Sequence, residues 1–89
     1  MFYAEARSHG NIDFQQFAPV SEPERIEAPT VRGVVDRLME YIGRWDLGGG
    51  NWPNVGVKRA DGSHVGNVSY NGRLWTPDRE TEIDIATAD

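Results

Sequence analysis

Two turn dipeptides, ten residues apart, constrain the fold of this chain more than any other feature. Asp61-Gly62 and Asn71-Gly72 are among the strongest short signals for a β-hairpin, because these residue types readily take the positive φ of a tight type I′ turn. Apolar residues alternate with polar ones on either side of both turns. The spacing predicts a three-stranded antiparallel meander over residues 54–76.

Loops of two residues at both turns would fix the register of this meander. Val55 then faces Val68, and Val68 faces Trp75, so that one row of large apolar residues crosses three strands. Val57 and Tyr70 share the face of that row, which we expect to be packed. The other face is expected to be mixed and to meet solvent, and it carries Lys58, Val65, Asn67, Ser69 and Leu74.

An amphipathic helix is predicted before the meander. Its apolar residues fall on one stripe at the helical period: Val31, Val34, Val35, Leu38, Ile42 and Trp45. Thr30 supplies an N-cap hydroxyl, and glycines 48–50 are expected to end the helix. The stripe should bury against Val55, Val57, Val68 and Trp75. The expected fold class is therefore α+β, with one amphipathic helix packed on an antiparallel sheet that ends in a three-stranded C-terminal meander.

The remaining segments give shorter signals. Residues 2–7 alternate as in a first strand, residues 8–11 are typical of a turn, and residues 12–15 predict a short returning strand. Residues 19–29 contain three prolines and three glutamates, which favours an extended connector. In residues 82–85 isoleucines alternate with acids, which predicts an edge strand.

Composition sets the class of protein. Of the 89 residues, 38% are hydrophobic, which suffices for one modest core, so we expect residues 1–89 to form a single domain. No stretch approaches the ~18–20 apolar residues that span a bilayer. Residues 1–7 lack the features of a secretory signal, so we expect a cytoplasmic protein without membrane contact. The absence of cysteine excludes disulfides and thiolate chemistry.

Charge is distributed unevenly along the chain. The net charge is −5 and the pI is near 4.9, which argues against a protein that holds duplex DNA by its phosphates. Residues 54–76 nevertheless sum to +2, and residues 77–89 sum to −4. The acidic tail is expected to pair with the basic residues of the meander.

No catalytic motif is present. Asp61, Ser63 and His64 are the residue types of a hydrolase triad, but neighbours on a strand point to opposite faces, so Ser63 and His64 cannot act together. His9 and His64 are the only histidines and have no ligand spacing. Glycines 48–50 are not followed by the Gly-Lys-Ser/Thr of a phosphate loop. We therefore expect no enzyme, no metal and no cofactor.

Two tryptophans bracket the meander, at Trp52-Pro53 and Trp75-Thr76-Pro77. With the Asp-Gly turn between them, residues 52–77 resemble a WW domain, which implies binding of proline-rich peptides on an aromatic groove. The pattern departs from that family at Ser69-Tyr70, where the family has paired aromatics. The proline also follows Trp75 one residue too soon. No binding residue is carried over from the resemblance.

The function expected from these features is binding. Small, acidic, cysteine-free α+β proteins of phages and mobile elements, anti-CRISPR proteins among them, act by occupying a partner's surface, and this chain is similar in size, charge and architecture. We expect a non-enzymatic protein that binds a macromolecular partner, most simply a protein, as an inhibitor of this type. Nucleic-acid binding through the sheet face and WW-like peptide binding are the alternatives. Dimerisation through the outer helix face or an edge strand is left open.

Four residues are predicted to make the partner contact: Trp52, Lys58, Arg59 and Arg73. Large aromatics and arginines dominate binding energy when a partner buries them. Trp52 lies outside the meander register, so the pattern does not require it in the core. The alternative for Trp52 is that it folds back as a lid over the end of the helix.

Overall fold

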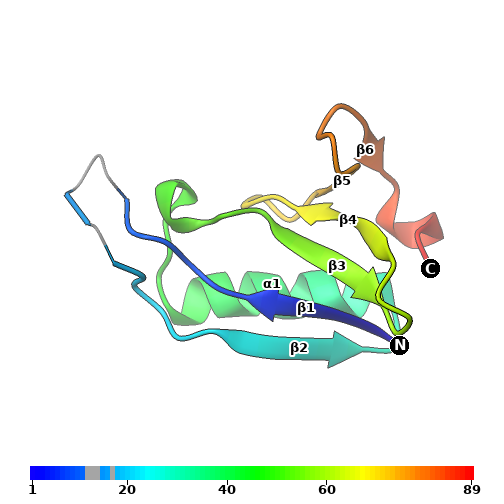
Figure 1. Cartoon of the computed structure of the whole chain (residues 1–89), viewed down its shortest axis with the longest axis horizontal. Helices are drawn as coiled ribbons and strands as arrows, with labels where there is room; N and C mark the ends of the chain where they lie inside the picture. The colour runs from blue at the N-terminus through cyan, green and yellow to red at the C-terminus, as the bar shows by residue number, and fades with distance from the viewer. Residues whose placement is uncertain (12–14, 17) are drawn as a thin grey trace.

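In the computed structural model of the chain, one helix packs against one face of a six-stranded antiparallel sheet (Figure 1). The structure describes residues 1–11, 15–16 and 18–89. The sheet order is β2-β1-β3-β4-β5-β6, so β1 lies between the edge strand β2 and β3. The strands are β1 (Phe2–Ala6), β2 (Glu24–Ala28), β3 (Val55–Arg59), β4 (His64–Val68), β5 (Leu74–Trp75) and β6 (Glu82–Ile83). The predicted α+β architecture is confirmed.

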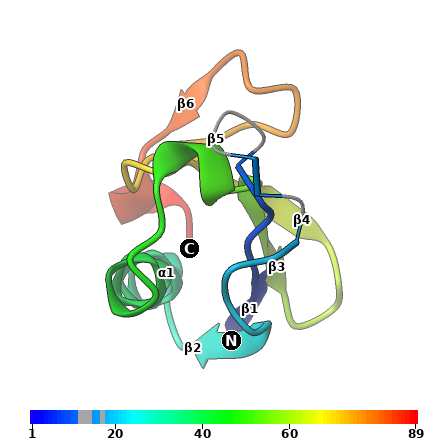
Figure 2. The ribbon, with the colours of Figure 1, turned by 90° about the vertical axis from the view of Figure 1, so that its left-hand side faces the viewer.

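Helix α1 (Val31–Arg44) begins as the sequence predicts. The side chain of Thr30 accepts a hydrogen bond from the backbone N–H of Gly33 at 3.0 Å. Figure 2, which views the molecule end-on, shows α1 on one side of β1 and β3. The helix brings its apolar stripe onto the sheet, so the N-cap and the periodicity together fix both its start and its orientation.

The end of α1 differs from the prediction. Asp46 takes a positive φ of 52° and donates to the carbonyl of Gly43, and the N–H of Leu47 bonds the carbonyl of Ile42 at 3.0 Å. These two bonds form a Schellman motif, which closes the helix at Arg44 and turns Leu47 back into the core. Glycines 48–50 therefore do not end the helix. They lie in and just before the short 3₁₀ turn η2 (Gly49–Asn51).

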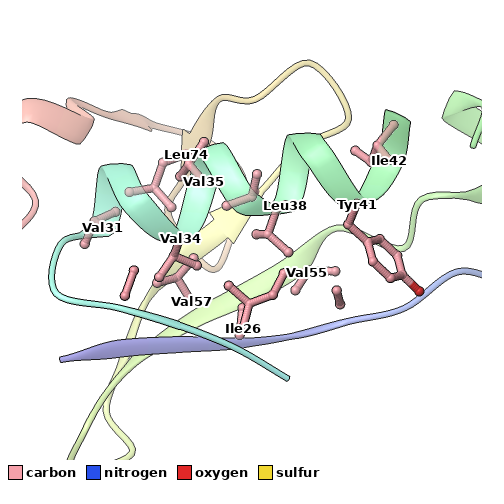
Figure 3. Packing of buried hydrophobic residues seen from close by; sticks show 14 of the residues in the cluster. Ile26, Val31, Val34, Val35, Leu38, Tyr41, Ile42, Val55, Val57 and Leu74 are labelled. Atoms are coloured by element: carbon pink, nitrogen blue, oxygen red, sulfur yellow. The ribbon is translucent and has the colours of Figure 1, made fainter. Parts of the chain in front are cut away.

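The core lies between α1 and the sheet (Figure 3). Most of the predicted contacts are buried: Val34, Val35, Leu38 and Ile42 on the helix, with Val55, Val57 and Val68 on the sheet. Three predictions of buried residues are wrong. Trp45 is the C-cap of α1 and is 37% exposed, and Trp75 is only partly buried. Tyr70, expected on the packed face, is 38% exposed and donates its hydroxyl to the carbonyl of Leu47. Tyr41 is fully buried instead, and its hydroxyl donates to the carbonyl of Glu22.

The second hairpin explains why Trp75 is outside the core. Gly72 has a φ of 80° and donates to the carbonyl of Ser69 at 3.0 Å, which makes a three-residue loop in place of the predicted two-residue loop. Val68 consequently pairs with Leu74, and Trp75 pairs with Asn67. A slip of one residue exchanges the two faces of a strand. Leu74 is therefore fully buried among the core residues, where Figure 3 shows it.

The first hairpin has the same kind of loop and a different outcome. Gly62 has a φ of 90° and donates to the carbonyl of Arg59 at 2.9 Å. Lys58 then pairs with His64, but Val57 pairs with Gly66, so Val65 is an extra residue in a β-bulge. The bulge restores the predicted pairing of Val55 with Val68. It also buries Val65, which the sequence placed on the mixed face.

The ends of the chain complete the sheet. β1 lies within the predicted strand 2–7. β2 was expected to be part of a connector over residues 19–29, but it pairs along its length with β1 and buries Ile26 and Ala28. β6 forms the predicted C-terminal edge, and Ile85 begins the 3₁₀ turn η3 (Ile85–Thr87). Of the strand predicted over residues 12–15, residues 12–14 lie outside the described residues, and Gln15 lies in a turn.

Candidate binding surface on the open face of the sheet

Strand alternation divides the side chains of the sheet between two faces. Ala4 and Val57 are buried beneath α1, so their neighbours in sequence point to the opposite face. We call this opposite face the open face, because its side chains are exposed or partly exposed. It carries Tyr3, Glu5, Lys58, His64, Asn67 and Trp75.

A hollow of about 460 Å³ occupies the middle of the open face, with Gly56 in its lining. Ala4 pairs with Val57, which puts Glu5 beside Gly56, and Gly56 pairs with Asn67. A Cβ on Gly56 would lie 2.8 Å from Nε2 of His64, so only glycine lets the histidine ring lie across this strand. His64 Nε2 is in turn 3.1 Å from Oδ1 of Asn67, which fixes the ring.

A second hollow of about 180 Å³ adjoins the first. Both are lined by Asn54 and Asn67, and the second is also lined by Ser69, Trp75 and Arg79. We call the two together the trough. Since Trp75 pairs with Asn67 across β4 and β5, the same register slip that removed it from the core places its indole in the trough.

The loop between β5 and β6 positions Arg79. The amide of Arg79 donates to the carbonyl of Thr76 at 2.7 Å, and Arg79 itself takes a φ of 65°. Asp78 accepts hydrogen bonds from the hydroxyl of Thr76 and from the amide of Glu80, and these bonds lower the pKa of its carboxyl. The loop is therefore tied internally, and it holds Arg79 beside Trp75 at the second hollow.

The electrostatics of the trough oppose those of the chain as a whole. Among the described residues, three cations line it, Arg7, Lys58 and Arg79, against one acid, Glu5. Within the described residues these three cations make no ion pair. Glu5 is engaged by the guanidinium of Arg25 at 3.1 Å.

Arg25 links Glu5 to the neighbouring side chains of the open face. Its guanidinium also contacts Glu27 at 2.8 Å and lies over the ring of Tyr3, 4.1 Å from the centroid. The Glu27 carboxylate, and then that of Glu5, raise the pKa of Arg25. Arg25 is thus shared between two carboxylates, and these three side chains together keep one negative charge. The three cations of the trough make no ion pair among the described residues, so its lining stays net positive.

The structure separates the basic residues that the sequence grouped together. Lys58 lies on the open face and lines the trough. Arg59, the next residue on the strand, points to the other side, donates to the hydroxyl of Ser63 and lines a different hollow near Met1. The three predicted cations therefore do not form one patch with a common orientation.

Arg73 and Trp52 also depart from the expected contact surface. Arg73 lies at the far end of β4 from Lys58, roughly 16 Å away at about 3.3 Å per strand residue, and approaches Glu82 at 4.0 Å. Trp52 is only 5% exposed, and its indole N–H donates to the carbonyl of Val68 at 2.9 Å. Trp52 packs near Tyr41 as the predicted alternative requires, so it does not present a contact at the surface.

Sequence reasoning missed several residues of the trough: Tyr3, Arg7, Asn54, Asn67, Trp75 and Arg79. The alternation of residues 2–7 did place Tyr3 and Arg7 on one face, opposite Ala4. No signal in the sequence, however, paired β1 with β3. Trp75 was missed because its face depends on a loop length that Asn71-Gly72 leaves open.

The described residues form neither a hydrolase triad nor a metal site. Ser63 donates its hydroxyl to Asp61 at 2.7 Å, whereas His64 bonds Asn67, so the three do not form a triad. Among the described residues, no group of three or more His, Asp or Glu is placed to hold a metal ion. None of the described helices is long and apolar enough to cross a membrane.

The WW-like segment 52–77 belongs to a larger sheet. Its packed face, with Val57 and Val68, lies beneath α1 and is not an exposed peptide groove. The open face instead presents aromatic surface, amides and cations that have no ion-pair partner among the described residues. No family model, curated protein or solved structure matches this chain, so the geometry of the trough carries the functional argument.

Proposed function

We propose that this protein is a non-enzymatic binding protein whose open sheet face engages a macromolecular partner. The observation that carries the proposal is the trough, where two adjoining hollows bring together aromatic rings, amides and three cations across β1, β3, β4 and β5. Within the part of the chain that the structure describes, these cations have no ion-pair partner. An antiparallel sheet commonly turns one polar face to water. A solvated face of that kind requires neither the hollow at Gly56 nor a tryptophan beside an arginine.

The lining of the trough favours binding over catalysis. Among the described lining residues, the one carboxylate, Glu5, is in an ion pair with Arg25, and the histidine is bonded to an amide. Neither group is hydrogen-bonded there to a nucleophile that it could activate. The inhibitor class expected from the sequence, in which a small cytoplasmic protein of phage type occupies a partner's surface, is one form of this function.

The test compares two triple variants with the same change of charge. The trough variant carries Arg7→Gln, Lys58→Gln and Arg79→Gln. The helix variant carries Arg32→Gln, Arg37→Gln and Arg44→Gln on the exposed outer face of α1. Tagged wild type and both variants are used to recover partners from the source cell, with and without nuclease, and the partners are read by mass spectrometry.

We expect the trough variant to lose the partner and the helix variant to retain it. Far-UV circular dichroism and Tm establish that both variants fold, since all six side chains are exposed. Retention of the partner by the trough variant, with loss by the helix variant, would place binding on the helix and overturn the proposal.

A further inference from the structure

The net positive charge of the trough indicates that the molecule it binds is negatively charged. The chain carries a net charge of −5, yet the trough presents Arg7, Lys58 and Arg79 without ion-pair partners among the described residues. Glu5, the one acid among the described lining residues, shares Arg25 with Glu27, so three cations face one acid in the lining. A basic hollow on an acidic protein is complementary to an anion, and three separate cations match an anion with several charges in a row.

The aromatic residues identify the shape of the occupant. Tyr3 and Trp75 lie on the same face, one lining each hollow, and both are partly exposed. Arg25 already covers one side of the Tyr3 ring, so a base could stack only on its other side. Every nucleobase has a flat π surface that stacks on such rings. Between the rings, the amides of Asn54 and Asn67 supply donors and acceptors of the kind that pair with base edges.

The surroundings of the trough select a single strand over a duplex. Glu82 pairs with Trp75 across β5 and β6, and Asp78 and Glu80 lie in the loop that carries Arg79. A duplex placed on Trp75 and Arg79 would bring its second strand of phosphates towards these acids. Affinity for duplex DNA requires more clustered cations than this surface has. A few unpaired nucleotides need only the three cations and the rings.

The same composition disfavours a protein as the occupant. The buried centre of a protein interface is typically apolar and depleted in lysine. The central hollow instead contains Lys58, Glu5, His64 and amides, of which lysine and glutamate are both depleted at such interfaces. From these observations we infer that the trough binds single-stranded nucleic acid, a few nucleotides at a time. The inference rests on the proposed function and names its partner.

The first experiment measures fluorescence anisotropy of labelled oligothymidylate and oligouridylate, each about ten nucleotides long, against a duplex of equal length. Three phosphate contacts predict a slope of about −2 for log K against log salt. Binding should therefore weaken by roughly 20-fold between about 50 and 200 mM salt. The trough variant should bind about tenfold or more weakly at low salt, and the helix variant should match wild type.

The second experiment follows stacking through intrinsic fluorescence. Stacking of a base on Trp75 should quench its emission, so Trp75→Phe should abolish the change on adding oligothymidylate. Trp45→Phe is the matched control, because Trp45 is an exposed tryptophan beyond the end of α1, outside the trough. It should leave the quenching intact.

The outcomes separate the inference from the function on which it rests. Absent binding of both oligonucleotides, or binding that the trough variant leaves unchanged, overturns the inference. If the trough variant then still loses a nuclease-resistant protein partner, the proposed function stands with a protein as occupant. If the trough variant loses neither oligonucleotide nor partner, both fall.

Discussion

The two hairpins of the meander have the same type of loop but differ in the register of their second strands. Each loop has three residues and is closed by a glycine at positive φ, Gly62 in one and Gly72 in the other. In the first hairpin the bulge at Val65 cancels the one-residue shift. In the second nothing cancels it, so Leu74 enters the core and Trp75 faces the trough. The candidate site therefore depends on a one-residue register shift that persists in the second hairpin and is cancelled in the first.

The largest expected effect tests which residue of β5 is in the core. Leu74→Ala should lower the free energy of unfolding by about 2–5 kcal/mol, because it empties a fully buried position. Trp75→Ala should cost less, since the indole is only partly buried. Urea denaturation of both variants measures the difference. The reverse order of costs would favour the two-residue loop and return Trp75 to the core.

Features that depend on residues close together in the sequence could be predicted, and features that depend on pairing between distant segments could not. The helix is local: Thr30 and the apolar stripe determine its start and its buried face within a few turns. The meander was also predicted, but its faces depend on a single residue of loop length, which Asp61-Gly62 and Asn71-Gly72 each allow in two forms. Trp75 was therefore assigned to the wrong face of the sheet.

The rest of the trough depends on pairing between distant strands. β1 contributes Tyr3 and Arg7 because it pairs with β3, more than fifty residues later in the chain. β2 was missed because prolines flank it, at Pro23 and Pro29. Proline is compatible with the ends of an edge strand, although it is typical of a connector. Periodicity within a segment cannot show which segment lies beside it.

A smaller effect compares the two loop glycines directly. Gly62→Ala and Gly72→Ala each place a side chain at a φ of 80–90°, which we expect to cost about 1–2 kcal/mol. A Cβ at Gly62 meets nothing within 4 Å, whereas one at Gly72 lies 3.2 Å from Sδ of Met39. Gly72→Ala should therefore be the more destabilising of the two in chemical denaturation. Equal Tm values for wild type and both variants would contradict the three-residue loops.

The smallest expected effect is a pH dependence of stability that only the first hairpin should show. Asp61 accepts hydrogen bonds from the hydroxyl and the amide of Ser63, and these bonds lower its pKa below the ordinary 3.8. A carboxyl with a lowered folded-state pKa stabilises the fold above its unfolded pKa, and that contribution is lost as the pH falls through the folded value. Asn71 occupies the matching position of the second hairpin, accepts from the hydroxyl of Ser69, and cannot titrate.

The difference in Tm between wild type and Asp61→Ala should therefore be present at neutral pH and should shrink as the pH falls below about 3.8. The difference for Asn71→Ala should stay constant over the same range, because its amide keeps the hydrogen bond at every pH. Thermal melts of the three proteins between neutral pH and pH about 2.5 measure both. A pH-independent difference for Asp61→Ala would mean that its carboxylate contributes nothing to the first turn. The two hairpins would then be held alike, by their glycines and their ladders alone.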